Sequence, residues 1–299
     1  MKATAFTYRS LLRMYELMPL KPLWCRLLKA LPLPHAKFYS DLKFRGPFTV
    51  NVSDRAFRMI HTGGTIENEI FWNGLDHGWE RVSTGLWVKL CASAKAIVDV
   101  GANSGVYSLV AAKVNPEARV LAFEPSAAVF AVLLQNIRIN SLTTIKAFPS
   151  ALSNHDGHAV LYDFNDPTLC SSSLNVAMFD STISRREIEV SVRTLDAVLS
   201  EENLANVDLV KIDVEMHEAE VLDGFARYLN RNRPSMLIEV LTDEIGMQIE
   251  RRVQGLDYLY FDIDEAGSPQ MRNSIKKSRK YNYLLCQPAV ASKLGLPAS

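Results

Sequence analysis

The pattern of apolar and polar positions changes character at residue 96. From there on, short apolar runs typical of buried strands alternate with segments in which apolar residues recur at helical spacing. The strands are expected at 96–99, 119–124, 145–152, 207–213 and 235–240, and the helices at 106–114, 127–139, 195–204, 221–229 and 243–254. This alternation predicts an α/β fold built on a mostly parallel sheet.

Other segments alternate apolar and polar residues, which is typical of half-buried strands. They are 158–164 and 187–192, expected as antiparallel strands flanking the serine-rich loop 170–173. Four further short segments are also expected as strands: 258–263 and 281–286 as the last two, and 48–52 and 56–61 as a hairpin. The main domain is therefore expected to span residues 46–299.

Residues 1–45 are expected to form an N-terminal helical extension. Apolar side chains with interspersed basic residues fill 4–31, and Pro19 and Pro22 interrupt them, which predicts two short amphipathic helices. These helices would pack as a cap on the main domain, or dock on a membrane surface or a partner enzyme, because a basic amphipathic helix can lie at a membrane interface.

Residues 96–109, AIVDVGANSGVYSL, predict a strand, a tight turn framed by Gly101 and Gly105, and the start of a helix. Such a turn brings backbone N–H groups and the positive end of a helix to one place, which suits an anionic or polar ligand. The spacing is GxxxG, whereas a dinucleotide site needs GxGxxG so that a pyrophosphate can approach the backbone. No Gly-Lys-Ser/Thr follows, which excludes a P-loop.

The next expected strand ends in Glu124 and Pro125. A carboxylate at this strand tip holds a ribose diol in nucleoside-binding α/β folds. Together with the turn, it indicates a ligand with a ribose but no diphosphate. S-adenosylmethionine fits, because its adenosine needs the acid and its methionine needs the turn; a nicotinamide nucleotide is the alternative.

Charged residues gather after the strand at 207–213. Asp213 and Glu215 are two positions apart, so both point the same way from an extended strand end, with Lys211 behind them. Methyl transfer to a hydroxyl needs alignment and a base for the alcohol proton. Asp213, Glu215 or His217, which titrates near neutrality, can supply that base.

Two other interpretations of this acidic cluster remain open. Asp213, Glu215 and Glu239 can hold a divalent cation that acidifies a sugar hydroxyl, so a metal is compatible with the sequence, although none is predicted. Alternatively, Asp213 only binds the methionine amine, and Glu215 only places negative charge at the start of the following helix.

Segment 67–87 combines three tryptophans with acidic residues that include Glu80. Aromatic faces stack on carbohydrate C–H groups while carboxylates bind hydroxyls, so this composition suits sugar binding. The alternative is a helical lid whose tryptophans belong to the core.

The composition is that of an ordinary globular protein. The 299 residues are 48% hydrophobic and 22% charged, with 33 basic and 33 acidic side chains. A net charge of zero provides no long-range attraction to nucleic acid, so a nucleic-acid substrate is disfavoured. Four scattered cysteines without zinc-site spacing, and no visible signal peptide or membrane span, lead us to expect a cytoplasmic protein.

An ordered set of motifs resembles the FkbM family of S-adenosylmethionine-dependent methyltransferases. The motifs are VDVGANSGVYSL (98–109), AFEPS (122–126), ALS (151–153) followed by Gly157, TLDAVL (194–199), DLVKIDVE (208–215), EVLDG (220–224) and the proline-led strand 234–240. The resemblance implies a class I Rossmann-like methyltransferase fold: a mostly parallel central sheet with helices on both faces and an antiparallel last strand. It also implies O-methylation of a sugar or polyketide hydroxyl.

The resemblance assigns roles to individual positions. It implies that Asp99, Gly101, Asn103 and Gly105 bind the methionine part, that Glu124 binds the ribose, that Ser150 and Ala151 lie near the adenine, and that Asp213 lies near donor and acceptor; Tyr107 and Pro125 complete the expected cofactor site. The family usually has glycine after the DVE triplet, where this chain has Met216. A side chain there would narrow the acceptor site or move His217 inward.

The sequence thus predicts an S-adenosylmethionine-dependent O-methyltransferase that acts on a sugar, glycolipid or related natural product, as a monomer or homodimer. One alternative is a nicotinamide-dependent oxidoreductase, against which the missing middle glycine counts. Another is a non-catalytic scaffold that keeps the cofactor pocket and recruits partners through its N-terminal helices.

Overall fold

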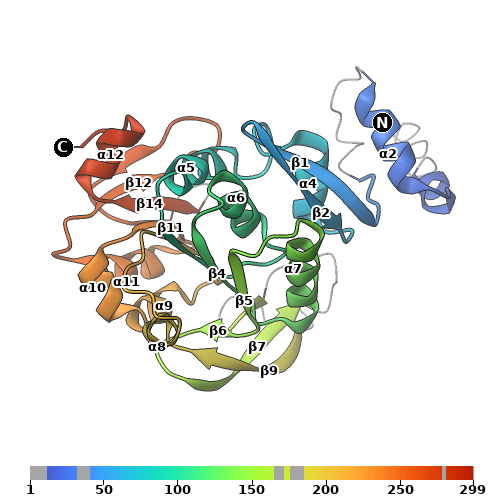
Figure 1. Cartoon of the computed structure of the whole chain (residues 1–299). Coiled ribbons are helices and arrows are strands. Elements are labelled where there is room, and N and C mark those ends of the chain that lie inside the picture. The colour runs from blue at the N-terminus through green and yellow to red at the C-terminus, as the bar shows by residue number, and fades with distance from the viewer. Residues whose placement is uncertain (1–11, 32–40, 165–171, 176–184, 278–280, 299) are drawn as a thin grey trace.

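The computed structural model describes residues 12–31, 41–164, 172–175, 185–277 and 281–298. An eight-stranded sheet lies at its centre, in the order β13-β12-β14-β11-β10-β3-β4-β5 (Figure 1). Its strands are β3 (Ala96–Val100), β4 (Arg119–Phe123), β5 (Ile145–Phe148), β10 (Leu209–Ile212), β11 (Ser235–Glu239), β12 (Leu259–Asp262), β13 (Gln270–Arg272) and β14 (Asn282–Cys286). β5, β4, β3, β10 and β11 are parallel, and β14 runs antiparallel to β11 and β12. The predicted sheet with an antiparallel last strand is confirmed.

Helices cover both faces of this sheet, as predicted. Ile97 belongs to the core beneath α4 (Thr65–Asn73), α5 (Arg81–Cys91), α6 (Val106–Val114) and α7 (Ala127–Ile139). Its neighbour Val98 belongs to the second core, beneath α8 (Leu195–Glu201), α9 (Glu218–Asp223), α10 (Ala226–Asn232) and α11 (Asp243–Val253). Successive strand residues point to opposite faces, so an uninterrupted apolar strand supplies both cores.

Strand order reverses at β3, whose neighbours are β4 on one side and β10 on the other. In open α/β sheets, the crevice outside the carboxyl ends of the strands at such a reversal is where ligands bind. The turn after β3 therefore lies where a ligand site is expected.

Two predicted elements are wrong in their extent. The strand expected at 145–152 is divided between β5 and β6 (Ala151–Leu152), and β6 belongs to a separate four-stranded sheet. The helix expected at 221–229 is split into α9 and α10 around Gly224, where a Cβ atom would lie 1.9 Å from the Ser153 carbonyl oxygen. This close approach of two backbones is not visible in local periodicity.

The separate sheet has the order β6-β9-β7-β8, with β7 (Gly157–Phe164), β8 (Ser172–Ser173) and β9 (Arg185–Arg193). The predicted antiparallel pairing of β7 and β9 is confirmed. The short helix α12 (Pro288–Leu294) and strand β13 were not predicted. Part of the serine-rich loop lies outside the described residues.

The predicted hairpin is confirmed as β1 (Gly46–Val52) and β2 (Arg55–His61). The backbone N–H groups of Arg58 and Ile60 on its edge donate to the side chains of Asn140 and Asn136 at 2.8 Å each, which ties the hairpin to the end of α7. The N-terminal segment contains a helix over 12–17 and α2 (Lys21–Ala30), as expected. None of the helices in the described ranges has the length and apolar composition that crossing a lipid bilayer demands.

Candidate active site

A cavity of about 610 Å³ opens at the carboxyl ends of β3, β4 and β10. The turn after β3, Glu124 after β4, and Asp213 after β10 line it together. Trp79 and Glu80, which precede α5, also line the cavity. The turn and Glu124, which the sequence assigned to one ligand, are therefore brought together, and Asp213 lies at the same cavity.

The turn after β3 is closed by two close approaches. Gly101 has φ +75°, and a Cβ atom there would lie 1.9 Å from the Asp213 carbonyl oxygen. Gly105 has φ +95°, and its Cβ would lie 2.5 Å from Leu133 Cδ1. Both positions thus favour glycine for its conformation, and Gly101 also requires it for space, because the atom it approaches belongs to the backbone.

Glu124 is connected to this turn by hydrogen bonds. Its Oε2 accepts from the backbone N–H of Asn103 at 3.0 Å, and its Oε1 accepts from that of Ser126 at 2.9 Å. Burial raises the pKa of Glu124 to about 7, although these hydrogen bonds oppose the rise. Each carboxylate oxygen keeps a further lone pair, so the group can accept hydrogen bonds from a diol at the cavity wall.

Two expected cofactor contacts are not on the cavity wall. Asp99 is fully buried, and its Oδ2 accepts from Ser108 Oγ at 2.6 Å on α6. Gly105 packs against Leu133 and also does not line the cavity. In this structure both residues support the turn and do not line the cavity, and their contact with a cofactor stays a prediction. Of the other expected cofactor residues, Gly101, Asn103, Tyr107, Glu124, Pro125, Ser150, Ala151 and Asp213 line the cavity.

A charged group occupies the end of the cavity near β10. Lys211 Nζ lies 2.8 Å from Asp213 Oδ2 and 4.8 Å from the centre of the Tyr107 ring. The Tyr107 hydroxyl donates to Glu80 Oε2. Burial raises the pKa of Glu80 to about 7, while nearby Lys211 opposes and Asp213 adds to the rise. A carboxylate with this pKa suits a general base at neutral pH.

The position of Glu80 at this cavity was not predicted from the sequence, where Glu80 was grouped with the sugar-binding features of segment 67–87. The three tryptophans of that segment lie in different environments in the structure. Trp72 and Trp87 are buried core residues that donate to the backbone carbonyls of Leu42 and Tyr107, respectively, whereas Trp79 lines the cavity. The core interpretation therefore holds for two of the three tryptophans.

Three carboxylates converge at the tips of β10 and β11. Among the described residues, Asp213, Glu215 and Glu239 each place one carboxylate oxygen within 4.8 Å of the others. Burial and the neighbouring acids raise the pKa of Glu239 well above its ordinary value. Oxygen ligands at this spacing can hold a divalent cation.

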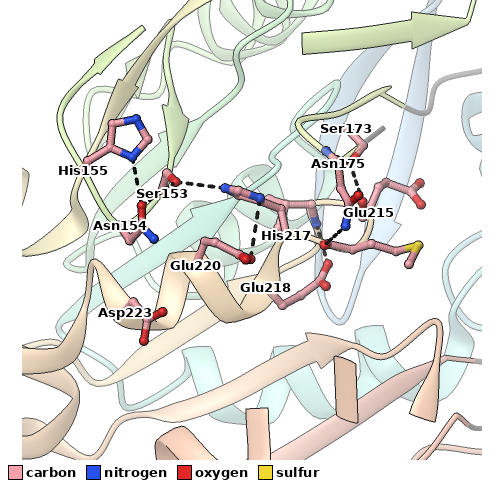
Figure 2. A network of polar contacts seen from close by, with 12 residues as sticks. Ser153, Asn154, His155, Ser173, Asn175, Glu215, His217, Glu218, Glu220 and Asp223 are labelled. Atoms are coloured by element: carbon pink, nitrogen blue, oxygen red, sulfur yellow. Dashed lines mark hydrogen bonds and ion pairs between the residues drawn. The ribbon is translucent and has the colours of Figure 1, made fainter. Parts of the chain in front are cut away.

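His217 lies at the edge of the cavity in the loop between β10 and α9 (Figure 2). Its Nε2 is 2.9 Å from Ser153 Oγ, and its Nδ1 is 3.6 Å from Glu220 Oε2. Burial lowers the pKa of His217, and Glu220 opposes this effect. Because both ring nitrogens are engaged within the chain, the geometry suits a residue that positions the loop.

Met216 does not narrow the cavity, contrary to the expectation. Its side chain packs against the core beneath α9, and its backbone has the left-handed φ of +72°. Asn175 Nδ2 donates to the Met216 carbonyl at 2.9 Å, and Ser173 Oγ donates to the carbonyl of Glu215 (Figure 2).

Comparison with known proteins identifies several methyltransferases that are similar in sequence to this chain. A methyltransferase from Sordaria araneosa, sdnD, is 32% identical over 155 residues, which cover 43% of this chain and 59% of the relative. The 31-O-demethyl-FK506 methyltransferase FkbM of Streptomyces tacrolimicus is 29% identical over 152 residues, covering 43% and 58%. The 2-O-methyltransferase NoeI of Sinorhizobium fredii is 28% identical over 152 residues, covering 46% and 60%. The chain thus spans about three fifths of the length of these relatives.

The family model for the FkbM methyltransferase domain matches residues 99–282, which begin in β3 and end in β14. The matched range contains every strand tip that lines the cavity, together with Glu124, Lys211 and Asp213. This chain belongs to the FkbM methyltransferase domain family.

Proposed function

We propose that this protein transfers a methyl group from S-adenosylmethionine to a hydroxyl of a small sugar, glycolipid or related natural-product acceptor. The observation that carries the proposal is that Glu124 and the turn at Gly101 face one cavity and are joined by the hydrogen bond from Asn103. Two relatives whose names specify O-methylation, FkbM and NoeI, support a hydroxyl acceptor.

The residues present fit this cofactor. The backbone of the turn reaches the cavity wall at Gly101 and Asn103, and Glu124 offers acceptors for a ribose diol. Ser150 and Ala151, which follow β5 and lead into β6, would border the adenine. Bound S-adenosylmethionine supplies an electrophilic methyl group and a good leaving group, so the protein must supply alignment and a proton acceptor.

In this proposal Asp213 serves the alignment of the cofactor and Glu80 serves as the proton acceptor. Asp213, fixed by Lys211 at 2.8 Å, would bind the amine of the methionine part. Glu80, held by the hydrogen bond from Tyr107, would accept the proton of the acceptor hydroxyl. Trp79 beside it provides an aromatic face suited to a sugar ring. Glu215 and His217 would shape the acceptor end, since their loop borders the cavity.

Calorimetric titration with S-adenosylhomocysteine tests the cofactor assignment. We expect wild-type protein to bind it and Glu124→Gln to bind about tenfold more weakly or worse, because a charge-assisted hydrogen bond is worth about 1.5–3 kcal/mol. The exposed Glu117, on the loop after α6, provides the control variant Glu117→Gln. Titration with NADH in place of S-adenosylhomocysteine tests the oxidoreductase alternative. Binding of NADH alone would overturn the proposal.

A further inference from the structure

The N-terminal segment carries an apolar surface that faces away from the protein. Among the described residues, eleven large apolar side chains are exposed, and seven of them lie between Met14 and Leu31. Leu20, Leu23, Trp24, Leu27 and Leu31 follow helical spacing and form one face, which we name the N-terminal stripe; each is between 42% and 87% exposed, as are Met14 and Leu17 in the preceding helix.

The opposite face of α2 fixes the helix to the domain. Cys25 is fully buried, and its Sγ lies 3.1 Å from the Tyr15 hydroxyl, which donates to the Lys43 carbonyl at 2.7 Å. Lys29 Nζ donates to the Phe71 carbonyl, and Arg26 donates to the Pro47 carbonyl at 2.8 Å. Polar contacts thus hold α2 against the domain while its apolar side faces outward, the reverse of an ordinary surface helix.

Charge is distributed unevenly between this segment and the rest of the chain. Residues 1–31 contain six basic side chains and one acidic one, whereas residues 32–299 contain 27 basic and 32 acidic side chains. The segment therefore carries a net charge of +5, and the remainder carries −5. Lys21, at the first position of α2, follows Leu20 at the edge of the N-terminal stripe, where a long basic side chain can reach the headgroups of a lipid surface.

We propose that α2 docks the protein on the surface of an anionic phospholipid membrane, with the N-terminal stripe inserted at the level of the headgroups. An outward apolar face, a tryptophan within it and flanking cations are the features of helices that lie in a membrane interface. In Figure 1, α2 lies at the periphery beside the hairpin β1–β2, so a flat surface can approach it. The rest of the chain carries a net negative charge, so it is not attracted to an anionic membrane. The N-terminal segment is therefore the part of the chain whose charge is complementary to that membrane.

Vesicle sedimentation with the full-length protein tests the docking. The probes are vesicles of equal parts phosphatidylglycerol and phosphatidylcholine, and vesicles of phosphatidylcholine alone. We expect binding to the anionic vesicles that weakens with rising salt, since salt screens the headgroup attraction. The double variant Leu23→Gln with Leu27→Gln should bind about tenfold more weakly or worse, because it removes two apolar side chains from the stripe and keeps helix propensity.

Met247→Gln is the matched control, because Met247 is 50% exposed on α11, outside the segment. Unchanged binding of S-adenosylhomocysteine by both variants would show that the fold is intact, and this measurement is independent of the vesicle result. Equal vesicle binding by the double variant, or no binding by the wild type, would overturn the proposal. A concentration-dependent dimer that the double variant abolishes, without vesicle binding, would instead identify the stripe as an interface between two copies.

Discussion

The Tyr107 hydroxyl donates a hydrogen bond to the carboxylate of Glu80, joining the first turn of α6 to the residue that precedes α5. The ammonium of Lys211 lies over the same tyrosine ring, 4.8 Å from its centre. An acid on the cavity wall is thus held by a neutral donor whose ring also contacts a cation. This arrangement suits a base that must be positioned against an acceptor hydroxyl.

Glu80→Gln should lower the rate of methyl transfer by about 10²–10⁴-fold, because general base catalysis contributes about that factor. Its pKa of about 7 has a second consequence: kcat/KM of the wild type should rise as pH increases through neutrality, as the carboxyl group loses its proton. The variant should lack this ascending limb. The pH dependence of kcat/KM for both proteins checks the prediction.

Tyr107→Phe provides the accompanying test. The hydrogen bond from Tyr107 lowers the pKa of Glu80, so its removal should move the ascending limb to higher pH without abolishing it. Lys211, Asp213 and Asn282 also act on this carboxyl group, and they remain in the variant. An unchanged limb in both variants would assign the proton acceptor to another residue.

Gly101→Ala should abolish binding of S-adenosylhomocysteine or prevent folding, because the added Cβ would collide with the Asp213 carbonyl. Gly255→Ala is an informative control. Gly255 has a similar φ of +79°, but no atom lies within 4 Å of its added Cβ. The Gly255→Ala variant should lose only about 1–2 kcal/mol of stability, because its left-handed backbone is unfavourable for alanine, and it should keep its affinity for S-adenosylhomocysteine. Equal effects of the two substitutions would mean that conformation, not close approach, requires Gly101.

Much of the fold and part of the site could be predicted from the sequence. Strand periodicity located β3, β4 and β10, and their parallel arrangement brings Gly101, Glu124 and Asp213 to one cavity. Local patterns indicate which residues follow a strand. They therefore predict sites that are built from strand tips.

For Glu80 and Asp99, local sequence patterns could not predict whether the residue lines the cavity. Glu80 precedes a helix and reaches the cavity only through the packing of α5 against α6, which periodicity does not encode. Asp99 is in the expected strand, but it is fully buried, its Oδ2 accepts from Ser108 on α6, and it does not line the cavity. The sequence located the acid without giving the direction of its side chain.

Stability should fall as pH rises, and Glu218→Gln should reduce this dependence. Glu218 is fully buried, and burial raises its pKa from the ordinary 4.5 to about 8, with the acids Asp213 and Glu215 adding to the rise. A raised pKa in the folded state favours the protonated form. Its contribution to the free energy of unfolding is therefore complete below about pH 4.5 and is lost as pH rises through about 8.

Each pKa unit corresponds to about 1.4 kcal/mol, so the loss is on the order of a few kcal/mol. Urea unfolding at about pH 5 and about pH 9 measures it for wild type, Glu218→Gln and the exposed control Glu189→Gln. The glutamine side chain of Glu218→Gln keeps an oxygen for the Val214 N–H, which donates to Glu218 at 3.2 Å. If the wild type and Glu218→Gln lose equal stability between these pH values, the buried acid is not the cause.

The stability of variants at position 216 should follow how well the residue there tolerates a left-handed backbone. Its φ of +72° is favourable for glycine and costs other residues about 1–2 kcal/mol. Met216→Gly should therefore be tolerated, since relief of this cost offsets the lost packing of the methionine side chain. Met216→Val should be the least stable of the three, because β-branched residues are rarely found at positive φ. Thermal unfolding of the three proteins measures the order. A valine variant as stable as wild type would show that the loop relaxes out of this conformation despite the hydrogen bond from Asn175.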